Sequence, residues 1–153
     1  MSGWIRQDDA DEWHLVGLLE YADAIDRGEF RLKCGGSVNT RRGWQERVSA
    51  LIAPDDRHEP CRHRAAREQY WWDRMRTAPM QPSNYMVRDL ALEIAPDLEG
   101  VQVVMDPRKG GPQRVRLMAR NLDVMLEGAA PAMNEAIGEL LAHLELDVRP
   151  ADR

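Results

Sequence analysis

VQVVMDPRKGGPQRVRLMARNLDVML, residues 101–126, contains three β-like runs separated by turn residues. The first two runs, 101–105 and 114–119, are joined by a polar segment rich in glycine, and the third run, 122–126, follows after two turn residues. Apolar and polar residues alternate along the second and third runs, which is typical of strands with one buried face. Short turns between such runs favour antiparallel pairing of neighbours. The stretch therefore predicts a three-stranded antiparallel meander.

An amphipathic helix is predicted after the meander, over residues 131–145. Pro131 is favourable at the start of a helix, and apolar residues then recur at helical spacing. The apolar face consists of Met133, Ala136, Ile137, Leu140, Leu141 and Leu144. Such a face needs a partner to cover, and the meander is the nearest one in the sequence.

The part of the chain before the meander predicts mainly helices. Apolar residues recur every three or four positions there, and Asp9 with Glu12 resembles a capping box at the start of the first helix. The predicted helices cover residues 9–27, 40–52, 60–77 and 84–95, and a short strand is predicted at 29–34. We therefore expect an α+β fold in one domain of residues 1–153, with an N-terminal part of four helices (1–95), followed by the three-stranded antiparallel meander and a C-terminal amphipathic helix (96–153).

The composition is that of an ordinary globular protein, with 31% charged and 43% hydrophobic residues and a formal net charge of -5. No apolar run approaches the length of about 20 residues that a membrane helix needs, so no membrane partner is expected. The N-terminus turns acidic at once and lacks the apolar segment of a signal peptide. These features predict a cytoplasmic protein.

A candidate zinc site lies around RHEPCRHR, residues 57–64. His58 and Cys61 are separated by two residues, His63 follows closely, and Cys34 offers a distant thiolate just before two glycines. Zinc in proteins prefers four ligands drawn from Cys, His and carboxylates. The sequence therefore suggests Cys34, His58, Cys61 and His63 as ligands, with zinc as the one cofactor considered.

Two other interpretations of this segment stay open at this point. One is a solvated loop of His and Arg beside two inert, buried cysteines. The other is a reactive thiol at Cys61, because a helix start and flanking cationic side chains lower the pKa of a cysteine. The second interpretation would make the protein a thiol-dependent enzyme.

A candidate partner-binding surface follows on the predicted third helix, where aromatic and basic residues are interleaved. Tryptophan, tyrosine and arginine are enriched in the residues that dominate protein interfaces. Trp71 and Trp72 are adjacent and point about 100° apart on a helix, so at least one of them is expected at a contact surface. The proposed set is Arg67, Tyr70, Trp71, Trp72 and Arg74.

A second basic group lies on and beside the turn between the first two strands of the meander. Two glycines there permit close approach of the backbone to an anion, and basic side chains surround them. The group consists of Arg108, Lys109, Arg114 and Arg116. Together with the arginine-rich helix, it is compatible with contact to a nucleic acid.

The sequence contains none of the phosphate-loop, dinucleotide-binding, nucleophile-elbow or metalloprotease motifs. We therefore expect a small intracellular, non-enzymatic binding or regulatory protein that acts through a protein-contact surface, on another protein or on a second copy of the chain. Its small size and its arginine-rich yet acidic composition would suit an accessory protein of a phage or mobile element. The alternatives are a nucleic-acid-contacting module with a zinc site and, third, the thiol-dependent enzyme.

Overall fold

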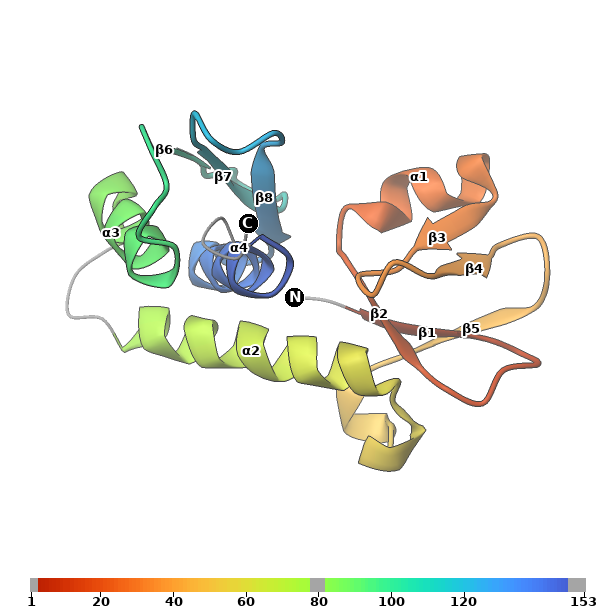
Figure 1. Ribbon diagram of the computed structural model, residues 1–153. Coiled ribbons are helices and arrows are strands. Elements are labelled where there is room, and N and C mark those ends of the chain that lie inside the picture. The colour runs from red at the N-terminus through yellow and green to blue at the C-terminus, as the bar shows by residue number, and fades with distance from the viewer. Residues whose placement is uncertain (1–2, 78–81, 149–153) are drawn as a thin grey trace. The chain divides into compact units, whose positions relative to one another are not determined.

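The computed structural model describes residues 3–77 and 82–148 (Figure 1). The chain divides into two compact units, unit 1 of residues 1–66 and unit 2 of residues 67–153. The boundary falls within the long helix α2 (Glu59–Arg76). Each unit has its own hydrophobic core.

Unit 1 consists mainly of short strands. Its three-stranded antiparallel sheet has the order β2-β1-β5, and a separate hairpin pairs β3 with β4. A single α-helix, α1, lies between β2 and β3 in the sequence, and two short 3-10 helices precede α2. The bounds are β1 Gly3–Gln7, β2 His14–Val16, α1 Glu20–Arg27, β3 Glu29–Arg31, β4 Ser37–Asn39, β5 Trp44–Arg47, η1 Ser49–Leu51 and η2 Pro54–Asp56.

Two small apolar clusters hold unit 1 together. The first lies around Phe30, which is 1% exposed and packs edge-on against Tyr21 and Trp44. The second lies around Trp4 and Trp13 and includes the buried side chain of Cys61. Neither cluster contains more than six buried residues, so packing alone gives this unit a modest core.

Unit 2 contains the remainder of α2, two further helices and an antiparallel sheet of order β6-β7-β8. Helix α4 packs on β7 and β8, and α3 packs on β6 (Figure 1). The core is formed by inward-facing residues of the strands, such as Val115 and Leu117, and by one face of α4. The bounds are α3 Asn84–Ile94, β6 Gln102–Asp106, β7 Gln113–Met118, β8 Leu126–Ala130 and α4 Met133–Asp147.

The overall α+β class agrees with the sequence prediction, but the predicted order of elements is wrong. Helices and strands are interspersed, and there is no N-terminal block of four helices among the described residues. The predicted helix 9–27 is divided between β2 and the short α1, and the predicted helix 40–52 is replaced by β5 and a 3-10 turn.

The two helices predicted at 9–27 and 40–52 do not form as predicted, because the apolar residues that would make up their buried faces are not buried together. Ile25 is 62% exposed, and Val48 and Leu51 are also exposed. Among the residues that are buried, Trp13 and Leu15 stand on either side of the half-buried His14, as in a strand. The third strand of the meander was also misplaced, because β8 begins at Leu126, where the predicted run ended.

Within the described part of the chain, none of the helices combines the length and the apolar character that crossing a bilayer requires.

Glu127 is expected to make unit 2 sensitive to acid. Burial by itself raises the pKa of Glu127, but hydrogen bonds from Arg114 and Arg116 outweigh it and hold that pKa below its usual value. A carboxylate with a lowered pKa in the folded state stabilises the fold above the pKa of the unfolded chain, and this stability is lost as the pH falls through the folded-state pKa. Glu127→Gln is therefore expected to cost about 1–3 kcal/mol near neutral pH, with a difference from wild type that shrinks below about pH 4.5.

Chemical denaturation at several pH values measures this difference. Glu93→Gln is the matched control, because Glu93 pairs with Arg74 at an exposed position, where its side chain is 56% accessible, and exposed ion pairs contribute little. Equal losses for the two variants at neutral pH would contradict the expectation.

Gly138 of α4 is expected to be required for close packing against α2. A Cβ atom at this position would lie 2.8 Å from the backbone nitrogen of Trp72 and 3.1 Å from the carbonyl oxygen of Glu68. Helical backbone cannot move aside as a flexible side chain can, so Gly138→Ala is expected to destabilise the protein by about 1–3 kcal/mol. Gly111→Ala is the control, because its nearest neighbour, the Cβ of Arg108, lies at 3.9 Å, and a denaturant midpoint that is the same for both variants would refute the argument.

Candidate metal centre

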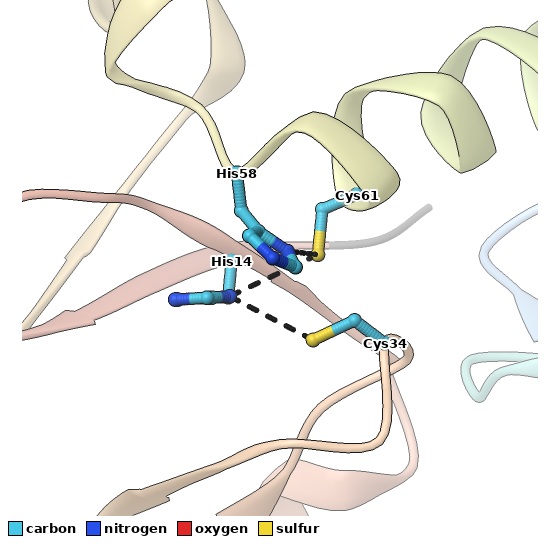
Figure 2. A group of neighbouring side chains, drawn as sticks. All are labelled: His14, Cys34, His58 and Cys61. Carbon is cyan, nitrogen blue, oxygen red and sulfur yellow. Dashed lines mark hydrogen bonds between the residues drawn. The ribbon is translucent and has the colours of Figure 1, made fainter.

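Four side chains of unit 1 converge in a Cys2His2 group. The ligand atoms of His14, Cys34, His58 and Cys61 all lie within 4.8 Å of one another. Figure 2 shows the two imidazoles and the two sulfurs directed toward a common centre. Three of the four residues belong to the ligand set predicted from sequence. The fourth predicted residue, His63, lies exposed on α2 and outside this group, and His14 completes the set instead.

Backbone hydrogen bonds to β2 and to Trp13, the residue before it, bring these segments together. The N–H of Trp13 donates to the carbonyl of Asp56 at 2.8 Å, and the N–H of His58 donates to the carbonyl of Trp13 at 2.9 Å. On the other side of His14, the N–H of Lys33 donates to the carbonyl of Leu15 at 3.0 Å. The residues that flank His14 therefore position the segments that carry His58 and Cys34.

Cys34 lies at the tip of a tight turn. The N–H of Leu32 donates to the carbonyl of Gly36 at 2.9 Å, and the N–H of Gly35 donates to the carbonyl of Leu32 at 3.0 Å. Gly35 has a φ of 93°, a conformation that glycine adopts without a steric penalty. The chain therefore reverses immediately after Cys34, with the Cys34 sulfur near the imidazole of His14.

His58 and Cys61 are brought together by a single helical turn. His58 directly precedes α2, and its carbonyl accepts a hydrogen bond from the N–H of Arg62 at 2.9 Å. Residues three apart lie on the same face of a helix. As a result, the Nδ1 atom of His58 is 3.3 Å from the Sγ atom of Cys61.

The distances fit a tetrahedral zinc ion. Zn–S bonds of about 2.3 Å and Zn–N bonds of about 2.0 Å give sulfur–nitrogen edges of about 3.5 Å in a tetrahedron. The sulfur–nitrogen distances here are 3.3 Å between His58 and Cys61, 3.7 Å between His14 and Cys34, and 4.0 Å between His14 and Cys61. Two thiolates and two imidazoles form one of the usual structural zinc sets, and all four ligands come from this chain.

The electrostatics favour a neutral imidazole at His14 and a protonated thiol at Cys61 until a cation binds. Burial, and next the charge of His58, lower the pKa of His14, against a smaller opposing effect of Glu12. Burial raises the pKa of Cys61 to about 12, and the neighbouring Cys34 sulfur adds to this effect. This is the opposite of the lowered pKa that the flanking cationic side chains suggested for a reactive thiol. A bound divalent cation deprotonates a coordinating thiol outright.

The partner-binding residues predicted on α2 do not form one exposed surface. Trp71 is 4% exposed and belongs to the core of unit 2, Trp72 is half-buried, and Tyr70 is 46% exposed. The guanidinium groups of Arg67 and Arg74 donate hydrogen bonds to Glu145 and Glu93, respectively.

Most of the basic group predicted for anion contact is engaged in ion pairs. Arg114 and Arg116 both bind Glu127 at 2.8 Å. Arg108 lies 3.1 Å from Asp106. Lys109 is exposed on the turn between β6 and β7. The ion pairs neutralise much of the positive charge that the sequence offered to an anion.

His14 is the member of the Cys2His2 group that sequence reasoning missed. The apolar spacing predicts a helix over residues 9–27, and a helix does not pair its backbone with the segments that carry Cys34 and His58. The signal that identifies it is the short alternation WHLV at residues 13–16, in which the polar His14 stands between the buried Trp13 and Leu15.

The chain matches no known protein-family model, no curated protein and no solved structure.

Wild-type protein purified without chelator is expected to contain about one Zn²⁺ per chain and to lose thermal stability when a chelator removes it. His14→Ala removes one of the four ligands, so it is expected to bind zinc far more weakly and to melt near the temperature of the chelator-treated wild type. His63→Ala is the matched control and is expected to keep its zinc, because His63 lies exposed and outside the group. Metal analysis by mass spectrometry, with thermal unfolding, checks both variants. Zinc-free wild type, or zinc retained in full by His14→Ala, would contradict the site.

Proposed function

We propose that the protein is a non-enzymatic binding protein whose unit 1 is stabilised by a structural Zn²⁺ ion. The observation that supports this proposal is the convergence of His14, Cys34, His58 and Cys61. A catalytic zinc ion is usually held by three protein ligands and keeps one position for water or substrate, whereas a structural ion is held by four. A set of four ligands supports a structural role for the metal.

Unit 1 has a physical need for such an ion. It spans residues 1–66, its strands are three to five residues long, and its core is divided into two small clusters. Domains of about 60 residues bury a smaller fraction of their surface than larger domains do, and a metal or another cross-link adds to their stability. Zinc bound here would connect β2, the turn at Cys34 and the start of α2.

The proposal includes a cytoplasmic location, as the sequence predicts. Thiols stay reduced in the cytoplasm and remain free to bind a metal, whereas an oxidising compartment would favour a disulfide. Both cysteines are free thiols in the structure.

For the binding role, we propose a protein partner that contacts the surface of α2 around Tyr70, here called the Tyr70 patch (Arg67, Tyr70 and Arg74). The Tyr70 ring is 46% exposed, and the guanidinium carbon of Arg67 lies 4.4 Å from its centroid. Ion pairs to Glu145 and Glu93 hold the two arginines in place. Tyrosine and arginine held in this way lose little conformational entropy on binding, which favours their use at interfaces.

The two alternative functions receive less support. The ion pairs of Arg108, Arg114 and Arg116 weaken the case for contact with a nucleic acid, because these arginines are already paired with carboxylates. The complete burial of the Cys61 side chain and the raised pKa of its thiol weaken the case for catalysis by Cys61. Both stay predictions, and binding of labelled DNA or RNA at low salt is the direct test of the first.

The Tyr70 patch can be tested by affinity capture from the native host. Tyr70→Ala is expected to leave the melting temperature nearly unchanged and to weaken binding of the captured partner by about 2 kcal/mol, or roughly thirtyfold in Kd. Tyr85→Ala is a matched control, because Tyr85 of α3 is also an exposed tyrosine, 70% accessible, with an arginine, Arg88, over its ring. A partner that binds Tyr70→Ala and wild type equally would exclude this patch.

A further inference from the structure

The two cysteines of the Cys2His2 group differ in accessibility and in the secondary structure that carries them. Cys34 is half-buried and lies on a turn followed by Gly35 and Gly36. Cys61 is completely buried and is fixed in the first turn of α2. Both sulfurs contact the Nδ1 atom of His14, at 3.7 Å and 4.0 Å. An oxidant from solution therefore reaches Cys34 first, and Cys61 stands close behind it.

We infer that this group is a peroxide-sensitive zinc site, in which hydrogen peroxide joins Cys34 to Cys61 in a disulfide and releases Zn²⁺. This inference rests on the proposed function, because it requires the site to bind zinc. It adds regulation to that site, since the ion that stabilises unit 1 is lost when the thiols are oxidised.

The chemistry proceeds in two balanced steps. The Cys34 sulfur first attacks one oxygen of hydrogen peroxide, the O–O bond breaks, and the departing hydroxide takes a proton to form water, which leaves a sulfenic acid on Cys34. The Cys61 sulfur then attacks the Cys34 sulfur, the S–S bond forms, the S–O bond breaks, and the departing hydroxide takes a proton from solvent and leaves as a second water. Two electrons pass from the two sulfurs to the peroxide, and the zinc ion does not change its oxidation state.

The geometry suits the second step. The ligand atoms lie within 4.8 Å of one another, so the two sulfurs must approach by no more than about 3 Å to reach the S–S distance of about 2.05 Å. The glycines after Cys34 allow the turn to shift, whereas α2 holds Cys61. A disulfide has no thiolate to donate to zinc, and the remaining imidazoles of His14 and His58 form only half of a structural site.

The test begins with wild-type protein loaded with zinc. On addition of hydrogen peroxide we expect about one Zn²⁺ released per disulfide formed, followed with a colorimetric zinc chelator, a thiol assay and mapping of the linked peptides by mass spectrometry. A thiol reductant followed by fresh zinc is expected to restore the site. Zinc that stays bound under peroxide, or zinc released while the cysteines carry sulfinic or sulfonic acids and no Cys34–Cys61 link, would overturn the inference.

Two variants test the order of the steps. Cys61→Ser leaves Cys34 without its resolving thiol, so a dimedone adduct is expected to accumulate on Cys34. Cys34→Ser leaves only the buried Cys61, and its dimedone adduct is expected to form about tenfold more slowly. Equal rates would overturn the assigned order, and the linkage mapped in wild type keeps the inference testable if either variant fails to fold. His63→Ala is the control that keeps all four ligands, and it is expected to respond as wild type does.

The two proposals fail in different ways. Wild-type protein that binds no zinc would refute the zinc-stabilised function before any oxidant is added. Wild-type protein that binds zinc and keeps it under peroxide would leave the zinc-stabilised function intact and refute the switch alone.

Discussion

The assembly of unit 1 depends on the backbone hydrogen bonds made by β2 and by the preceding residue, Trp13, on both edges of this segment. On one edge β2 pairs with β1, opposite Gly3, Trp4 and Ile5. On the other edge, Leu15 accepts from Lys33, and Trp13 bonds to Asp56 and His58. Trp13 and the three residues of β2 thereby join segments that are separated by more than 40 positions in the sequence. His14 lies between Trp13 and Leu15, whose backbone bonds position the segments of His58 and Cys34. The candidate metal group therefore forms only if this strand pairing forms.

This dependence explains why the fold was predictable in one unit and not in the other. In unit 2, α4 carries a long apolar stripe that is buried where the sequence places it, as Ile137 and Leu141 illustrate. In unit 1, the apolar residues are few and the elements short, so a helical spacing such as that ending at Ile25 arises by chance while the side chain stays exposed. Strand pairing between distant segments decides the local structure there, and no window of sequence contains that information.

The members of the candidate site likewise differ in how far the sequence predicts them. His58 and Cys61 are recognisable from sequence because one helical turn fixes their separation, and Cys34 because the following glycines permit a tight turn. His14 is brought to the group only by the bonds of its two neighbours, and its partners lie 20 to 47 residues away. Local geometry therefore yields part of a metal site, and completing the set of ligands requires the topology.

Several arginines of unit 1 stack on the buried tryptophans Trp13 and Trp4. The guanidinium carbons of Arg6 and Arg47 lie 4.9 Å and 5.1 Å from the Trp13 ring centroid, and that of Arg57 lies 5.2 Å from Trp4. A planar guanidinium stacks on an indole and still donates hydrogen bonds in its own plane, as Arg57 does to the carbonyls of Ser49 and Ile52. Lysine has no planar group and cannot do both. In unit 1 these three arginines pack on the aromatic residues beside the Cys2His2 group, so part of the arginine content of the chain stabilises the fold.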